Sequence, residues 1–110
     1  MTFDEYQNKA LTTAINNCEP LMQKTIWTMG IVGEAGEVLE KWKKIVAYHE
    51  GVIMDSDLLE LSKELGDVVW YIAVLADALG LSLEEIMQTN VKKLEDRAKR
   101  KVLKGAGDNR

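Results

Sequence analysis

The sequence predicts an all-α protein with four helices in its subunit. Apolar residues recur at steps of three and four through most of the 110 residues, which is the spacing of a helix with one buried face. A single proline, Pro20, and charges spread along the whole chain favour long helices with few interruptions. The length allows one domain, and a domain of this size buries only a modest fraction of its surface, so association with a second copy would stabilise it.

The first helix is expected to begin after Thr2 and to run for about 15 residues. Thr2 and Glu5 have the spacing of a capping box, in which each side chain accepts a hydrogen bond from the other residue's backbone N–H. The segment Asn-Asn-Cys-Glu-Pro at 16–20 should end this helix. A second helix then follows over residues 21–47.

The second helix carries an apolar stripe bordered by acids. The stripe consists of Trp27, Ile31, Val38, Trp42 and Ile45. On a helical wheel, Glu34 and Glu37 fall beside this stripe rather than opposite it. Glycines also recur every three residues, at Gly30, Gly33 and Gly36, although each costs up to about 1 kcal/mol relative to alanine inside a helix. Either another helix or a ligand approaches closely there, or the helix kinks between Gly30 and Gly33.

After a loop, a third helix is expected over residues 57–79, with Ser56 or Asp57 as its N-cap. Its core seam alternates steps of four and three and consists of Leu61, Leu65, Val68, Ile72, Leu75 and Leu79. Val69 and Trp70 lie off this seam, where a monomer usually shows charge. They indicate a second buried face, and a partner subunit is its most economical occupant.

The fourth helix is expected to start at a capping box of Ser82 and Glu85, after Gly80 has ended the third helix. Its apolar face consists of Leu83, Ile86, Met87, Val91 and Leu94. We therefore predict one domain over residues 1–98. Residues 99–110 form a basic, glycine-containing tail that is too polar to pack alone.

Charge and cysteine content narrow the function classes. The formal net charge of −4 gives no basic footprint for a nucleic-acid polymer, although the C-terminal part is locally basic. Cys18 is the single cysteine, so an intramolecular disulfide is impossible and a reducing compartment is expected. The start of the chain has no signal-peptide pattern, and the longest apolar run, 68–76, is too short to cross a bilayer. These features predict a cytoplasmic protein without a membrane partner.

Four acids carry the chemistry that the sequence suggests. Glu34 and Glu37 are three residues apart, as are Glu64 and Asp67, so each pair projects from one side of its helix. If the pairs converge, carboxylates about 4 Å apart repel by about 4 kcal/mol at an effective dielectric constant of about 20. Such a cluster needs a cation or must take up protons. Oxygen ligands without nearby cysteine or histidine favour Mg²⁺, and Mn²⁺ also fits.

Two other interpretations use the same acids. Surface glutamates are commonly solvated and paired with lysines, here Lys41, Lys44 or Lys63. A di-iron carboxylate bundle also gathers acids from facing helices, but it usually needs Glu-x-x-His motifs. Neither acidic pair is followed by histidine, and His49, the single histidine, lies in the expected loop. We therefore set the di-iron interpretation aside.

The acidic pattern resembles a known family. Glu34-x-x-Glu37 is followed after 26 residues by Glu64-x-x-Asp67, and this is similar to the signature of the MazG-like all-α nucleoside triphosphate pyrophosphohydrolases. Further similarity lies in Tyr6-Gln7, in the flanks of both acidic pairs, in the turn at 79–85 and in Asn90-x-x-Lys93-Leu94-x-x-Arg97. The resemblance covers most of the chain.

The resemblance implies hydrolysis of a (deoxy)nucleoside triphosphate to the monophosphate and pyrophosphate, with water attacking the α-phosphorus. The acids implied to bind Mg²⁺ and to serve catalysis are Glu34, Glu37, Glu64 and Asp67. It also implies a homodimer or a dimer of dimers, with a neighbouring chain completing the site, and a role in cleansing the nucleotide pool. Some members read Glu-Glu-x-x-Glu, whereas Gly33 replaces the first acid here, so the number of metal ions stays open.

The remaining candidates are substrate contacts. By resemblance, Asn90, Lys93 and Arg97 line the nucleotide. Lys41, one turn beyond Glu37, is a candidate for phosphate contact, and Trp42 is a candidate for stacking on the base. A position in the core is the commoner role for a tryptophan at helical spacing. The tail either folds over bound nucleotide or is disordered, and the alternative function is a nucleotide-binding or regulatory bundle without turnover.

Overall fold

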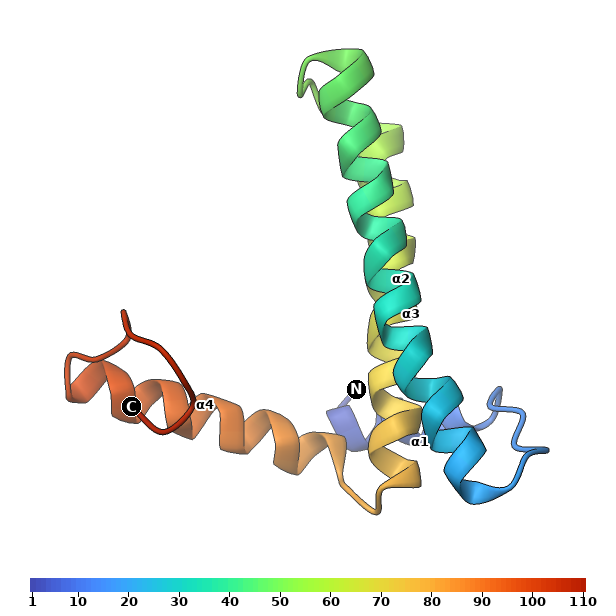
Figure 1. Cartoon of the computed structure of the whole chain (residues 1–110), viewed down its shortest axis with the longest axis vertical. Helices are drawn as coiled ribbons and strands as arrows, with labels where there is room; N and C mark the ends of the chain where they lie inside the picture. The colour runs from blue at the N-terminus through green and yellow to red at the C-terminus, as the bar shows by residue number, and fades with distance from the viewer.

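The computed structural model describes residues 1–110 and contains four helices and no strand, which confirms the all-α class. The helices are α1 (Phe3–Leu11), α2 (Pro20–His49), α3 (Asp55–Ala78) and α4 (Leu83–Lys99). α2 and α3 form a long antiparallel hairpin, α1 packs at its base, and α4 leaves α3 at a bend of 106° (Figure 1). No single helix is long and apolar enough to cross a bilayer. The bent pair of α3 and α4 reaches the required length and apolar character only when the two helices are counted as one segment.

α1 is shorter than the periodicity predicts, because it ends at Leu11 rather than near residue 16. The hydroxyls of Thr12 and Thr13 donate to the carbonyls of Lys9 and Ala10, at 2.6 and 3.0 Å. Threonine side chains that bond the preceding backbone in this way compete with helix continuation. The predicted capping box at the other end of α1 is present, between Thr2 and Glu5.

The start of α3 also differs from the prediction. Its N-cap is Met54 rather than Ser56 or Asp57, and α3 begins at Asp55. The Asp57 carboxylate accepts a hydrogen bond from the Met54 backbone N–H at 2.9 Å, so it caps from the third position of the helix. The predicted N-cap of α4 is correct, because the Ser82 hydroxyl accepts from the backbone N–H of Glu85 at 3.2 Å.

The structure explains one of the three glycines of α2, namely Gly30. α2 runs unbroken from Pro20 to His49, so the predicted alternative of a kink is wrong. The other alternative, a close approach, is correct at Gly30, because a Cβ atom there would collide with the ring of Tyr71 on α3. Gly33 and Gly36 have no neighbour within 4 Å of an added Cβ, and the fold of the single chain does not explain them.

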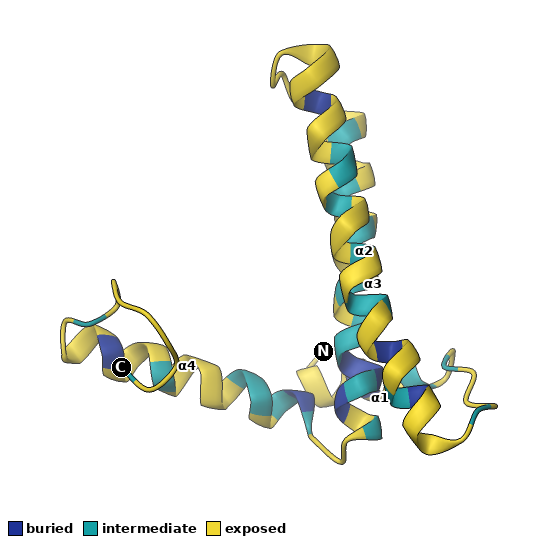
Figure 2. Cartoon of the chain, viewed as in Figure 1, coloured by how far each residue is buried: buried dark blue, intermediate teal, exposed yellow.

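The core lies at the base of the hairpin, and each of the four helices contributes at least one side chain to it (Figure 2). It consists of Ala10, Trp27, Ala73, Val74 and Leu83. Trp70 packs edge to face against Trp27, with ring centroids 5.5 Å apart, and its indole N–H donates to the Thr13 hydroxyl at 2.9 Å. The predicted second packed face is therefore present at Trp70, but residues of its own chain cover it in place of a partner subunit, and Val69 is exposed.

Away from this core, the hairpin is a two-helix arm with exposed apolar side chains. Only 10 of the 110 residues are buried, because two helices can cover only one face of each other. The core positions predicted for Trp42, Leu65 and Leu79 are wrong in the single chain, where these side chains are 43, 54 and 52% exposed. Ile45 is buried far along the arm, as its place in the α2 stripe predicts.

We expect Gly30→Ala to destabilise the fold by about 1–3 kcal/mol, because its methyl group displaces the Tyr71 ring from the aromatic cluster. Thermal unfolding would show a midpoint lower by several degrees. Gly33→Ala is the matched control and should raise the midpoint slightly, because its methyl group meets open space and alanine favours the helix. Equal midpoints for the two variants would contradict the close approach.

Candidate metal and nucleotide site

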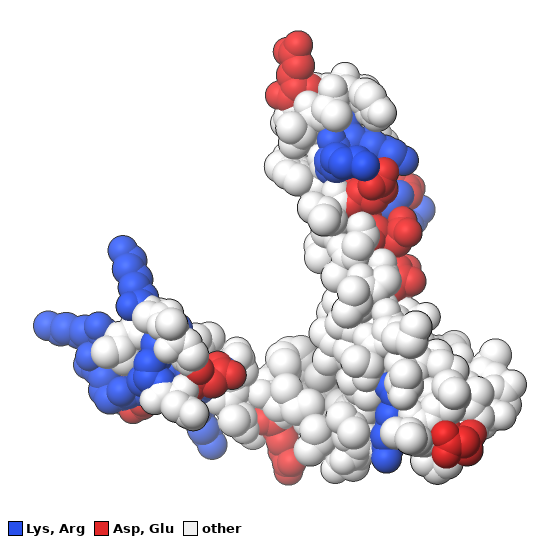
Figure 3. Space-filling view, in the orientation of Figure 1, with Lys and Arg blue, Asp and Glu red and all other residues white.

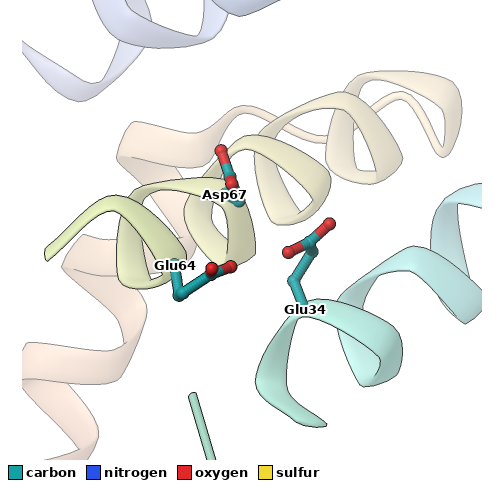
Figure 4. A group of neighbouring side chains, drawn as sticks. All are labelled: Glu34, Glu64 and Asp67. Carbon is teal, nitrogen blue, oxygen red and sulfur yellow. The ribbon is translucent and has the colours of Figure 1, made fainter. Parts of the chain in front are cut away.

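Three of the four predicted acids converge midway along the hairpin. Glu34 on α2 faces Glu64 and Asp67 on α3, and one carboxylate oxygen from each lies within 4.8 Å of the others (Figure 4). Glu64 and Asp67 meet Glu34 because they lie one turn apart on α3 and the antiparallel pairing brings that turn opposite Glu34. Glu37 is exposed and lies outside this group of three.

The cluster is electrostatically unfavourable without a cation. Burial raises the pKa of Glu34 above its ordinary value, and the negative charges of Asp67, Glu64 and Glu37 raise it further. A bound divalent ion would remove the same repulsion that a proton removes. The ligand atoms are carboxylate oxygens alone, a set that fits Mg²⁺ or Mn²⁺ rather than zinc.

Lys41 supplies a positive charge at the edge of the cluster. Its Nζ lies 3.6 Å from a carboxylate oxygen of Glu64 and 3.5 Å from one of Glu60, so it links α2 to α3. Glu64 thus belongs to the acidic cluster and also pairs with a lysine. The metal-site interpretation and the surface ion-pair interpretation therefore both apply to this residue. Lys44 pairs instead with Glu40 on its own helix, at 3.8 Å.

The predicted nucleotide contacts on α4 lie apart from the acids. α4 makes no contact with α2, and the Lys and Arg side chains at its end are separated from the acids of the hairpin (Figure 3). The structure therefore does not bring Asn90, Lys93 or Arg97 to Glu34 within one chain. Asn90 is exposed, Lys93 is half-buried and Arg97 is buried, with 4% of its surface accessible.

Arg97 is covered by the C-terminal tail. The tail turns back along α4, and Asp108 accepts hydrogen bonds from Lys93 at 3.1 Å and from Arg97 at 3.4 Å. These two cations lower the pKa of the Asp108 carboxyl. Arg110 donates to the carbonyls of Val102 and Leu103, which closes the turn. Sequence reasoning missed this packing; the one signal was a single acid, Asp108, in an otherwise basic tail.

The fold and the cluster together define an all-α protein with a carboxylate site between two antiparallel helices. The model of the MazG nucleotide pyrophosphohydrolase domain matches residues 23–102, a segment that contains all four predicted acids. The chain therefore belongs to the MazG nucleotide pyrophosphohydrolase family, and the resemblance suggested by the acidic spacing is confirmed.

Two relatives are similar to this chain. The Gene 37 protein of Mycobacterium phage L5 is 44% identical over 114 aligned residues, which cover 100% of both chains. The uncharacterized protein YvdC of Bacillus subtilis (strain 168) is 50% identical over 38 residues, or 34% of this chain and 36% of YvdC. No solved structure matches the chain. Neither name states a substrate, so the substrate must be inferred from the site.

We expect Glu34→Gln to raise the thermal midpoint of the metal-free protein at neutral pH by a few degrees. The raised pKa means that ionisation of Glu34 destabilises the folded state. This destabilisation is absent below the ordinary carboxyl pKa and develops as the pH rises through the raised pKa of Glu34. The gain from Glu34→Gln should therefore vanish in acid. Thermal scans at several pH values, with and without Mg²⁺, measure the difference in midpoint between Glu34→Gln and the unaltered protein.

Mg²⁺ should stabilise the unaltered protein and leave Glu34→Gln nearly unaffected, because the variant lacks one ligand. Glu95→Gln is the matched control, since Glu95 is exposed on α4 outside the cluster, and its response to Mg²⁺ should be unchanged. Equal stabilisation of Glu34→Gln by Mg²⁺ would contradict a role for Glu34 as a ligand.

Proposed function

We propose that the protein is a Mg²⁺-dependent hydrolase that converts (deoxy)nucleoside triphosphates to monophosphates and pyrophosphate. The observation that carries this proposal is the convergence of Glu34, Glu64 and Asp67 inside the segment that matches the family. A role in removing surplus or non-standard triphosphates from the nucleotide pool, in the cytoplasm, fits a small hydrolase with this substrate class.

The acids have distinct parts in the proposed reaction. Glu34, Glu64 and Asp67 would hold Mg²⁺, with Glu37 as the fourth ligand or as the group that orients or deprotonates the attacking water. When bound, the ion neutralises charge on the phosphates. The water oxygen forms a bond to the α-phosphorus, the bond from that phosphorus to the bridging oxygen breaks, and pyrophosphate leaves with the electron pair.

Lys41 and Trp42 are proposed substrate contacts near the acids. The Lys41 ammonium already lies beside Glu64, so a small side-chain movement would turn it to a phosphate oxygen. Trp42 is 43% exposed, which leaves part of its indole free to stack on a base. Trp42 also lies among the apolar side chains that a second copy would cover. The proposal therefore includes two roles for Trp42, stacking on the base and packing against the second copy.

A second copy of the chain would complete the site. The two-helix arm exposes apolar side chains on both helices, a surface that monomers rarely leave open. They include Met29, Val32, Leu39, Val46, Leu58, Leu59 and Leu65. A homodimer or a dimer of dimers would bury this surface and allow α4 of one copy to carry Asn90, Lys93 and Arg97 to the acids of another.

The test of the reaction is a panel of ribo- and deoxyribonucleoside triphosphates with Mg²⁺, with pyrophosphate and orthophosphate measured separately. We expect pyrophosphate and the monophosphate, with turnover lowered by about 100-fold or more in Glu64→Gln and in Glu37→Ala. Glu95→Gln is the matched control and should retain full turnover. Orthophosphate with the diphosphate would contradict the proposed bond cleavage.

Mg²⁺-dependent nucleotide binding without any product would instead favour the binding or regulatory bundle. Isothermal titration of the same nucleotides, with Mg²⁺ and with excess chelator, separates that outcome from a protein that binds no nucleotide. Absence of both binding and turnover would contradict both functions.

The shared site predicts complementation between two inactive variants. Glu64→Gln and Lys93→Ala should each be inactive alone, because one lacks an acid and the other lacks the cation supplied by the neighbouring copy. When an equimolar mixture is dissociated and reassembled, half of the dimers are mixed and each has one intact site, so about a quarter of full activity returns. No recovery in a sample that sediments above the 12.4 kDa chain mass would contradict a site shared between copies.

A further inference from the structure

A pocket of about 290 Å³ opens at the base of the hairpin, apart from the acidic cluster. The loop between α1 and α2, the first turns of α2 and one residue of α3 form it. Its walls include the indoles of Trp27 and Trp70, which meet edge to face, and the side chain of Gln23. None of the four predicted acids lines this pocket.

Gln23 is buried without the hydrogen bonds that burial requires. Its surface is 3% exposed, and its Oε1 has no hydrogen-bond partner in the fold. Gln7 provides the contrast, because its buried amide makes three hydrogen bonds to the backbone. Most buried polar atoms in folded proteins are paired, so the unpaired Oε1 of Gln23 indicates a partner from outside the chain.

The Thr13 hydroxyl and the Cys18 thiol, two other polar groups of the pocket, already have hydrogen bonds within the chain. The Thr13 hydroxyl donates to the carbonyl of Ala10 at 3.0 Å and accepts from the Trp70 indole N–H at 2.9 Å. The Cys18 thiol lies 3.6 Å from Oδ1 of Asn17, to which it donates. The Gln23 amide is therefore left for a ligand that enters between the two indoles and the loop.

The pocket lies on a line with the acids. Gln23 precedes Glu34 by 11 residues, or about three helical turns, so it lies on the same side of α2 and about 16 Å away along the axis. Trp70 follows Asp67 by almost one turn on α3. Because α2 and α3 are antiparallel, both steps lead from the acids towards the base of the hairpin. The opposite direction leads to the charged Lys41 and Glu60.

We propose that this pocket, rather than the exposed face of Trp42, receives the nucleobase of the substrate and that Gln23 binds the edge of the base. This inference rests on the proposed function, because it assigns the base-binding part of the same nucleotide site. A carboxamide presents an acceptor and donors side by side, and a half-turn of the amide exchanges their positions. It therefore pairs with a base edge that carries an adjacent donor and acceptor, while an indole offers a flat apolar face for the ring.

The first test uses free nucleosides, so that no phosphate or metal takes part. In proton–nitrogen correlation spectra of the full chain, adenosine, guanosine, cytidine and uridine are titrated separately. We expect the indole N–H signals of Trp27 and Trp70 to shift with at least one nucleoside, while that of Trp42 stays. A shift confined to Trp42, or no shift with any nucleoside, would overturn the proposal. So would an equal shift with Mg²⁺ and tripolyphosphate, which carry no base.

The second test replaces Gln23 with a side chain of similar size that cannot pair. In Gln23→Met, discrimination in kcat/KM between the best and the worst base should fall by about tenfold or more. The thermal midpoint should stay equal or rise, because an unpaired buried amide has been removed. Gln88→Met, at an exposed position on α4, is the matched control and should preserve the ranking of bases. A preserved ranking with a lowered midpoint in Gln23→Met would assign Gln23 a purely structural role and overturn the proposal.

The two proposals fail in different ways. If nucleosides shift Trp27 and Trp70 but no triphosphate releases pyrophosphate, the base pocket stands and the proposed reaction fails. If pyrophosphate is released and the ranking of bases is indifferent to Gln23→Met, the reaction stands and the base pocket fails.

Discussion

The buried amide of Gln7 holds together the corner on which the rest of the chain depends. Its Nε2 donates to the carbonyls of Ala73 and Leu81, and its Oε1 accepts from the backbone N–H of Leu83, all at 3.1 Å. Leu81 lies in the turn between α3 and α4, where the backbone leaves its helical hydrogen bonds, and Leu83 is the first residue of α4. One side chain of α1 therefore fixes the bend and sets the direction in which α4 leaves the hairpin.

The sequence predicts the four helices because apolar periodicity reports which side of a helix avoids water. It fails where a side chain acts on the backbone. Thr12 and Thr13 end α1 early by bonding the preceding carbonyls, and Asp57 caps α3 from inside the helix rather than ahead of it. Periodicity also does not say what covers an apolar side chain. Trp42 and Leu65 follow the pattern of core residues and are nevertheless exposed in the single chain.

The acidic cluster was predictable because the register of an antiparallel hairpin follows from the two helical patterns. Two carboxylates at a three-residue step on α3 must meet whatever α2 presents at that level, which is Glu34. The relation of α4 to the acids was not predictable in the same way, because it depends on the bend of 106° at the corner. The unpaired amide of Gln23 could not be predicted either, because the sequence does not show whether a glutamine side chain is buried or exposed.

The distance between the small core and the acids has a consequence for how the chain moves. Amide hydrogens near Ala73 are protected by packing from several helices, whereas those around Glu34 are protected mainly by a single facing helix. Local opening of the arm therefore needs less free energy than global unfolding, and it separates Glu34 from Glu64 and Asp67 without disturbing the base of the hairpin. A ligand that contacts both helices holds the arm closed. Hydrogen-exchange protection of the arm therefore reports whether the acidic cluster holds a ligand.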